Sequence, residues 1–228
     1  GPIPEQEPER QEDCYSGEWT NWQMAAIPIK SLGRELVDNM ADMAHFGPIH
    51  YSKVKSFRNT MEGHKFVQYM VGGHQILTEG DGALITSVAT YEGPAYMTTT
   101  MTGLMDGHPM TTHLLVSHIP VDMENFIINF GVMMKKDPAI SEAGNKAMVE
   151  EYTEKNIESF HQDVAIWNNK CIIDNPLMCD GDGPVHLVRK WYSQFMTDVA
   201  DIQDDQVRAR QHVTVEGPTV EEVIAAMA

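Results

Sequence analysis

Between about residues 65 and 136, glycine-containing turns divide the chain into short runs rich in valine, threonine and aromatic residues. The turns recur at intervals of roughly ten residues and include Gly72-Gly73, Gly80-Asp81-Gly82, Gly93-Pro94 and Asp106-Gly107. Because β-branched and aromatic residues favour extended backbone and glycine permits tight turns, this pattern is typical of consecutive hairpins. We therefore predict an antiparallel sheet with strands over residues 65–71, 74–78, 83–91, 96–104, 111–119 and 126–134.

A helical period replaces the strand pattern after residue 140. Apolar residues recur there at spacings of three and four, which predicts one helix over 141–170, the longest in the chain. The residues in this series are Ala147, Met148, Tyr152, Ile157, Phe160, Val164 and Trp167. The other predicted elements are a first strand over 19–29, an irregular segment over 50–60, and helices over 34–46, 186–199 and 220–227. The sequence thus indicates an α+β fold.

The length of 228 residues is sufficient for one large domain or two small ones. Residues 1–17 are rich in Pro, Glu and Gln and are expected to form an extended lead-in, followed by one domain over 18–228. No run of 18 apolar residues occurs, so we expect no membrane span. The N-terminus lacks a basic and apolar signal pattern. The odd and sparse number of cysteines favours a cytoplasmic protein.

The net charge of −17 argues against two classes of partner. Nucleic acids and anionic membranes are bound without sequence specificity through basic surface, which an acidic chain lacks. The three cysteines, Cys14, Cys171 and Cys179, are too few and too far apart for a zinc site and fit reduced thiols. None of them begins a Cys-x-His or Cys-x-x-His element, so the chain cannot build a Rieske-type 2Fe–2S cluster from its own residues.

Two histidines and two aspartates lie within thirteen residues, from Asp38 to His50. On a helix, Asp38, Asp42 and His45 would share one face, since they are spaced i, i+4 and i+7. Gly47-Pro48 is expected to break this helix after residue 46, which would let His50 turn back toward His45.

This spacing suggests a metal site. Two neutral imidazoles and one carboxylate form the ligand set of non-haem iron(II) centres, which leave positions open for oxygen. Asp42 would then accept a proton from a ligand imidazole and fix its tautomer. Because the chain has ten histidines, the pair is also compatible with two ordinary histidines.

A third ligand is available on the long predicted helix. Asp163 shares a helix face with Phe160 and Trp167, so its carboxylate is set on the stripe expected to be buried. An unpaired carboxylate there would be costly, and we expect a cation or a metal as its partner. The alternative is a solvent-exposed aspartate.

The order Asp42-x-x-His45-x4-His50 followed by a distant helical Asp163 resembles the catalytic domain of Rieske non-haem iron oxygenases. More narrowly, it resembles the oxygenase component of 3-ketosteroid 9α-hydroxylases. The resemblance runs from about residue 19 to residue 202. The stretches that carry it are 18–22, 34–46, 62–64, 162–170, 173–179, 182–184 and 191–195.

The resemblance implies a helix-grip (START-like) antiparallel sheet, wrapped by the long helix, as the catalytic domain over 18–228. It implies an apolar pocket of steroid size beside Fe(II) bound by His45, His50 and Asp163, with Asp42 as the bridge to the electron donor. The implied substrate contacts are Gln68, Met97, Val116, Phe160 and Trp167. Val116 departs from the polar Asn-Cys-His that ketosteroid enzymes usually carry in this strand.

The implied reaction is hydroxylation of a steroid or sterol, with one oxygen atom of O2 inserted into a C–H bond. Electrons would come from a 2Fe–2S cluster on a missing domain or a partner chain, reduced by a separate reductase that carries FAD and uses NADH. The implied assembly is a homo- or hetero-trimer. The second departure from the family is the absence of the Rieske domain from this chain.

Three other functions remain open from the sequence. The first is a non-enzymatic helix-grip domain that binds steroids or other lipids. The second is a Rieske-family oxygenase that acts on an aromatic acid or another apolar compound. The third is a structural or assembly subunit without iron or a pocket.

Overall fold

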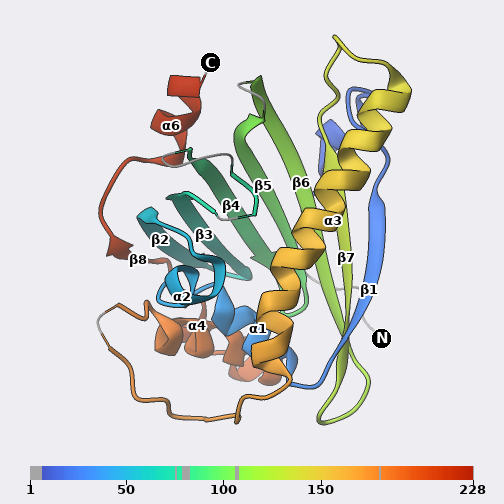
Figure 1. The fold of residues 1–228 in the computed structure, drawn as a ribbon. Coiled ribbons are helices and arrows are strands. Elements are labelled where there is room, and N and C mark those ends of the chain that lie inside the picture. The colour runs from blue at the N-terminus through green and yellow to red at the C-terminus, as the bar shows by residue number, and fades with distance from the viewer. Residues whose placement is uncertain (1–6, 75, 79–82, 106–107, 180, 228) are drawn as a thin grey trace.

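The computed structural model describes residues 7–74, 76–78, 83–105, 108–179 and 181–227. The described strands form one sheet in the order β1-β7-β6-β5-β4-β3-β2-β8 (Figure 1). All neighbouring strands pair antiparallel, as predicted. The strand bounds are β1 Gln23–Ile29, β2 Val54–Glu62, β3 Lys65–Gly72, β4 Ile85–Glu92, β5 Tyr96–Met105, β6 His108–Pro120, β7 Phe126–Met134 and β8 Arg210–Val215.

Helices cover both faces and one end of this sheet (Figure 1). Their bounds are α1 Gly33–Asn39, α2 Phe46–His50, α3 Glu142–Trp167, α4 Val185–Tyr192, α5 Asp204–Val207 and α6 Val220–Met227. The 26-residue α3 crosses one face diagonally and contacts β1, β7 and α2. The short α6 packs against β3, β4 and β5. A long helix on an antiparallel sheet confirms the predicted α+β, helix-grip-like class.

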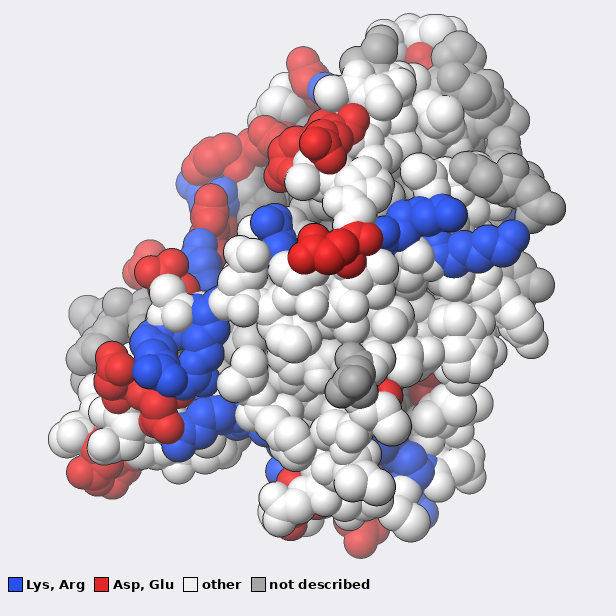
Figure 2. All heavy atoms as spheres, turned by 90° about the vertical axis from the view of Figure 1, so that its left-hand side faces the viewer, with Lys and Arg blue, Asp and Glu red and all other residues white. Residues whose placement is uncertain are grey.

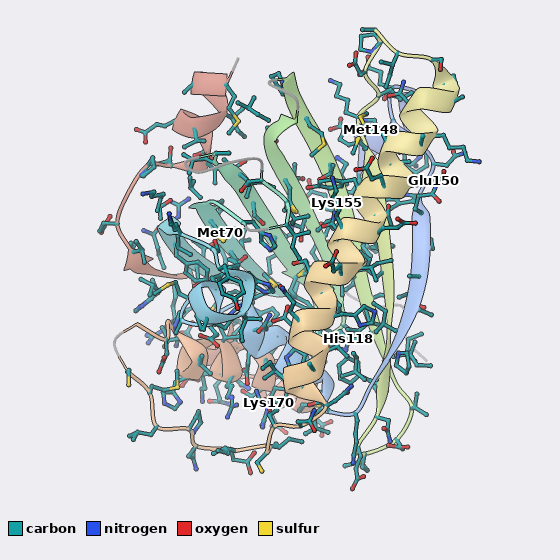
Figure 3. The ribbon with its side chains drawn as sticks, viewed as in Figure 1. Met70, His118, Met148, Glu150, Lys155 and Lys170 are labelled. Atoms are coloured by element: carbon teal, nitrogen blue, oxygen red, sulfur yellow. The ribbon has the colours of Figure 1, made fainter. Side chains whose placement is uncertain are left out.

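The long helix α3 has two different sides. Glu150 and Lys155 lie on its outer, partly solvent-exposed side (Figure 3). The side facing the sheet and α2 carries residues three and four apart: Asn145, Val149, Tyr152, Thr153, Asn156, Ser159, Asp163, Val164 and Trp167. This buried stripe contains several polar residues, which a purely structural helix would avoid.

Two hydrophobic clusters make up most of the core. The first lies between α3 and strands β1, β6 and β7, and its buried members include Ile27, Ile29, Val116, Phe126, Ile128, Phe130, Val132, Tyr152, Val164 and Trp167. The second joins α1 and α4 to the sheet through Val37, Met40, Ala41, Met61, Phe66, Ala89, Tyr91, Val185, Val188 and Trp191. The two clusters hold α3 and α1 in fixed positions on the sheet.

Several predicted elements are confirmed and others are wrong. Strands β3 to β7 and helices α3 and α6 appear where the patterns placed them, whereas the first strand begins only at Gln23 and the 186–199 helix ends at Tyr192. In the strand predicted over 74–78, residues 74 and 76–78 are not extended, because the amide of Thr78 donates to the carbonyl of His74 in a turn, and residue 75 lies outside the described residues. Residues 79–82 lie outside the described residues.

Two strands were not predicted. The segment expected to be irregular contains β2, whose period is obscured by a bulge between Val54 and Ser56 and by a polar residue on its inner face. That residue, Asn59, is fully buried and donates to the carbonyl of Met40 at 3.1 Å. Strand β8 is half-exposed and lies at the edge of the described sheet, paired with β2, so its sequence carries little signal of its own.

The predicted helix over 34–46 is also wrong in its extent. Helix α1 ends at Asn39, so Asp38, Asp42 and His45 do not share one helical face. Helix α2 begins at Phe46 and contains Gly47-Pro48 in its first turn, where the missing N–H of proline is tolerated. The chain therefore breaks within residues 40–45 and not, as predicted, after residue 46.

An ion network joins α1 to α4. Glu35 and Asp38 on α1 are 1% and 7% exposed. The guanidinium of Arg189 donates to Asp38 at 2.9 and 2.7 Å and also to the carbonyls of residues 173 and 174. Lys170 (labelled in Figure 3) forms an ion pair with Glu35. The network ties α1 to the segment that follows α3.

Charges of both signs are mixed on the face shown in Figure 2. Lysine and arginine side chains lie beside aspartates and glutamates there, and a broad region between them carries no charge. A separate basic patch of the kind that binds nucleic acid is not visible on this face. None of the helices described is long and apolar enough to cross a membrane.

The ion network predicts a large effect of Arg189→Leu. Removing the guanidinium leaves the buried carboxylate of Asp38 without its ion-pair partner, whereas Glu35 keeps Lys170, so the free energy of unfolding should fall by about 3–5 kcal/mol. Arg208→Leu is the matched control, since this arginine is exposed and such surface changes usually stay within about 0.5 kcal/mol. Urea unfolding measures both variants, and equal losses would contradict the assigned role.

The buried His118 predicts a dependence of stability on pH. His118 (Figure 3) is 4% exposed, lies between the rings of Tyr91 and Phe126, and has its pKa lowered by burial to about 4. The unfolded chain, with a histidine pKa near 6.5, takes up this proton first as the pH falls. The contribution of His118 is therefore complete above about pH 6.5, and roughly 3 kcal/mol is lost by pH 4.

His118→Phe should make the decline in stability between pH 6.5 and pH 4 shallower than in the wild-type protein. Urea unfolding at a series of pH values gives the difference between the two proteins, which cancels the contribution of other histidines. Parallel curves would show that His118 carries no such linkage.

Candidate metal centre

The structure brings His45, His50 and Asp163 together from separate parts of the chain. His45 directly precedes α2, His50 ends α2, and Asp163 lies in the C-terminal half of α3, which contacts α2. One ligand atom from each residue lies within 4.8 Å of the other two. Among the described residues, His45, His50 and Asp163 are the cluster of histidine, cysteine and acidic side chains that is close enough to hold one metal ion.

Adjacent residues of α3 hold both ring nitrogens of His50. Nδ1 lies 2.9 Å from the Oε1 of Gln162, so the Nδ1–H donates to this carbonyl and Nε2 is left with its lone pair. Nε2 lies 3.3 Å from Oδ2 of Asp163. Two metal–ligand bonds of about 2.1 Å at a right angle place their ligand atoms about 3 Å apart. The spacing therefore suits two ligands of one ion.

The tautomer of His45 is fixed by the main chain. Its Nδ1–H donates to the carbonyl oxygen of Asp42 at 2.6 Å, which leaves Nε2 as the ligand atom. The carboxylate of Asp42 is farther away, at 3.7 Å, and accepts from the amide of Ala44. The predicted contact of Asp42 with a ligand imidazole is thus made by its carbonyl, and its carboxylate is 38% exposed.

The two imidazoles have different protonation properties. Burial lowers the pKa of His45, which favours the neutral ring that binds a metal. Burial also acts to lower the pKa of His50, but the hydrogen bond and charge of Asp163 and the bond from Gln162 outweigh it and raise this pKa. A proton therefore competes with a metal mainly at His50.

A second turn supports the turn that carries His45. The amide of Met43 donates to the carbonyl of Asp182 at 3.3 Å. Gly183 has a φ of +82°, and a Cβ at this position would lie 2.1 Å from the carbonyl oxygen of Ala41. Only glycine permits this close approach of the two backbones. Residues 182–183 thus help to position His45.

A cavity of about 170 Å³ opens beside the three residues. Its lining is mostly apolar and includes Met70 (Figure 3), Leu77, Ile85, Ala89, Met97, Met101, Leu114, Phe130 and Phe160. Three of the predicted substrate contacts, Gln68, Met97 and Phe160, lie in this lining. Val116 and Trp167 do not: they are 1% and 3% exposed and pack in the core cluster under α3.

Two residues of the centre were not identified from the sequence. One is Gln162, whose contact with His50 depends on the position of α3. The other is His74, whose ring stacks on His50 with centroids 5.2 Å apart and contacts the hydroxyl of Ser159 through Nε2 at 3.0 Å. Burial lowers the pKa of His74 to about 4. The sequence feature that could have identified Gln162 is its position next to Asp163 on the predicted helix.

A family model described as "3-Ketosteroid 9alpha-hydroxylase C-terminal domain" matches residues 1–196. The chain is 41% identical over 198 residues to a 3-ketosteroid-9-alpha-monooxygenase, oxygenase component, of Rhodococcus rhodochrous, covering 84% of this chain and 51% of that protein. A protein of the same name from Mycobacterium tuberculosis is 36% identical over 201 residues, covering 86% and 52%. The chain thus spans about half the length of the curated relatives it matches.

Solved structures share the fold at much lower identity. NdmB of Pseudomonas putida CBB5 has a TM-score of 0.60 at 12% identity, over 91% of this chain and 60% of that chain. NdmA of the same strain with caffeine has a TM-score of 0.57 at 11% identity, over 90% and 61%. The family assignment comes from the match over residues 1–196 and from the curated relatives. This chain belongs to the 3-ketosteroid 9α-hydroxylase C-terminal domain family.

Proposed function

We propose that this chain is the catalytic part of a Rieske-type oxygenase that hydroxylates a steroid at an iron(II) ion held by His45, His50 and Asp163. The observation that carries the proposal is the convergence of these three ligands beside an apolar cavity. The names of the curated relatives, which are oxygenase components of 3-ketosteroid monooxygenases, supply the substrate class.

The donor set fits the proposed metal. Two imidazole nitrogens and one carboxylate oxygen match the facial triad of non-haem iron(II) oxygenases, which leaves coordination positions free. When bound, the iron supplies the oxygen chemistry. The chain supplies two neutral imidazoles in a fixed tautomer and a buried carboxylate that balances the charge of the ion.

The cavity orients the substrate and excludes water. Its apolar lining suits the rings of a steroid, and Gln68, Met97 and Phe160 are the proposed contacts. Its volume of about 170 Å³ is below the roughly 300–1,000 Å³ of pockets that hold drug-sized ligands. Entry of a steroid therefore requires repacking, to which Met70, Met97 and Met101 are suited because their unbranched side chains adapt easily.

Electrons would reach the centre from the side of Asp42. Its half-buried carboxylate lies in a cleft of about 220 Å³ that also contains Asp38, Asp182 and Arg189. We propose that a 2Fe–2S cluster on another domain or chain docks here, reduced by a separate reductase with FAD and NADH. We also propose a homo- or hetero-trimer, the assembly implied by the family resemblance, in which the cluster of one subunit supplies electrons to the iron of the next.

Metal content tests the proposal directly. Protein purified without oxygen and loaded with Fe(II) should hold about one iron per chain by elemental analysis, and His45→Ala or Asp163→Ala should lose it. His161→Ala is the matched control, because this exposed histidine lies on α3 two residues from Asp163 but outside the triad. Iron retained by both triad variants, or steroid binding without any metal, would instead favour a lipid-binding domain.

Activity tests the substrate class. With a Rieske donor and a reductase added, the iron-loaded protein should hydroxylate one or more members of a panel of 3-ketosteroids, and Asp163→Ala should not. An iron-loaded protein that oxidises aromatic acids and no steroid would show an oxygenase of different specificity. Product analysis by mass spectrometry separates the two outcomes.

The contact between Gln162 and His50 predicts an effect on metal affinity. Gln162→Leu removes the acceptor for the Nδ1–H of His50, and loss of such a partner typically lowers affinity by about 10–100-fold. Gln162→Glu retains an acceptor and should bind the metal more tightly than the leucine variant. Anaerobic titration against a competing chelator measures both, and wild-type affinity of the leucine variant would exclude the role.

A further inference from the structure

Most buried polar side chains that line the cavity already have a hydrogen-bond partner. Gln68 donates through Nε2 to the carbonyl of Met40 at 2.8 Å. His74 and Ser159 contact each other at 3.0 Å. Asn156 donates to a carbonyl within its own helix at 2.8 Å. These contacts hold the side chains in place and occupy at least part of their hydrogen-bonding capacity.

Ser87 and Thr99 are different. Both line the cavity and are only 6% and 4% exposed, yet neither hydroxyl has a hydrogen-bond partner among the residues that the structure describes. On the opposite face of β4, Thr86 is equally buried but donates to the carbonyl of Thr102 at 3.1 Å. Neither hydroxyl oxygen is among the buried unpartnered side-chain atoms, so both are open to the cavity. A ligand that displaces water from the cavity must offer these hydroxyls a hydrogen-bond acceptor or leave them unpaired at a cost.

The two hydroxyls lie on neighbouring strands at the centre of the sheet. Ser87 on β4 pairs with Met101, and Thr99 on β5 pairs with Ala89, which makes Ser87 and Thr99 diagonal neighbours on one face. Diagonal neighbours in an antiparallel pair are roughly 7 Å apart. An oxygen atom placed between them can accept from both.

The surroundings indicate the kind of oxygen. Met97, Met101 and Leu114 also line this part of the cavity, and none of them can donate a hydrogen bond. A carbonyl oxygen has two lone pairs and carries no hydrogen, so it suits two hydroxyl donors in an otherwise apolar environment. A carboxylate would be bound poorly there, because the described residues that line the cavity include no lysine or arginine.

We propose that Ser87 and Thr99 donate hydrogen bonds to one ketone oxygen of the substrate and determine which carbon faces the metal. The inference rests on the proposed function, because it takes a ketosteroid as the ligand. A fused ring system is rigid, so anchoring one oxygen fixes the positions of the other carbons. A steroid that lacks this ketone would leave both hydroxyls unpaired and would bind more weakly.

Binding of two matched steroids tests this proposal. One is a 3-ketosteroid and the other has a CH2 group in place of the ketone. Calorimetry on the iron-loaded wild-type protein should show a preference for the ketone of at least about tenfold, the size expected of one or two hydrogen bonds. In Ser87→Ala/Thr99→Val the preference should fall below twofold, and each single variant should lie between.

Thr86→Val is the matched control, because it removes a threonine hydroxyl from the outer face of the same strand. Its ketone preference should equal that of the wild-type protein, and urea unfolding shows whether each variant is folded. If the double variant is folded and keeps the full preference, the inference is wrong while the proposed function stands. If the wild-type protein binds neither steroid, the proposed function fails, and the inference fails with it.

Discussion

The carboxylate of Asp163 lies 3.3 Å from the imidazole of His50, between α2 and α3, and the candidate centre depends on this contact. A carboxylate in this position is stable only with a partner, because burial penalises its charge. The position of Asp163 depends on the packing of the whole helix, because α3 packs against β1 and β7 through Val149, Tyr152 and Trp167. The contacts between the long helix and the sheet therefore determine where the carboxylate of Asp163 lies.

The other side of the centre is built from irregular backbone, and polar contacts replace helical packing there. The carbonyl of Met40 accepts hydrogen bonds from the side-chain amides of Asn59 and Gln68. The main-chain amide of residue 43 donates to the main-chain carbonyl of residue 182. Arg189 holds the end of α1 through Asp38. Buried polar contacts of this kind add little net stability, but they allow only one arrangement of the turn that carries His45.

The sequence predicted the elements that have a clear period of their own, such as β7 and α6. Its spacing and resemblance also singled out His45, His50 and Asp163, which the structure brings together. It did not predict β2 or β8, because Asn59 and a bulge interrupt the alternation and the pairing of the two strands joins segments about 150 residues apart. The roles of Gln162 and His74 also arise only when α3 and α2 meet. Tertiary contacts, which local patterns do not contain, decided these cases.

The methionines around the cavity have a consequence for the durability of the protein. Met70, Met97 and Met101 carry thioethers, which reactive oxygen species convert to sulfoxides. A sulfoxide is polar and bulkier, so each such event would make the lining less able to accept a hydrocarbon skeleton. If oxygen is activated beside these side chains, turnover without a well-placed substrate would damage the cavity from within. Tight coupling between ligand occupancy and oxygen use would then protect the protein itself.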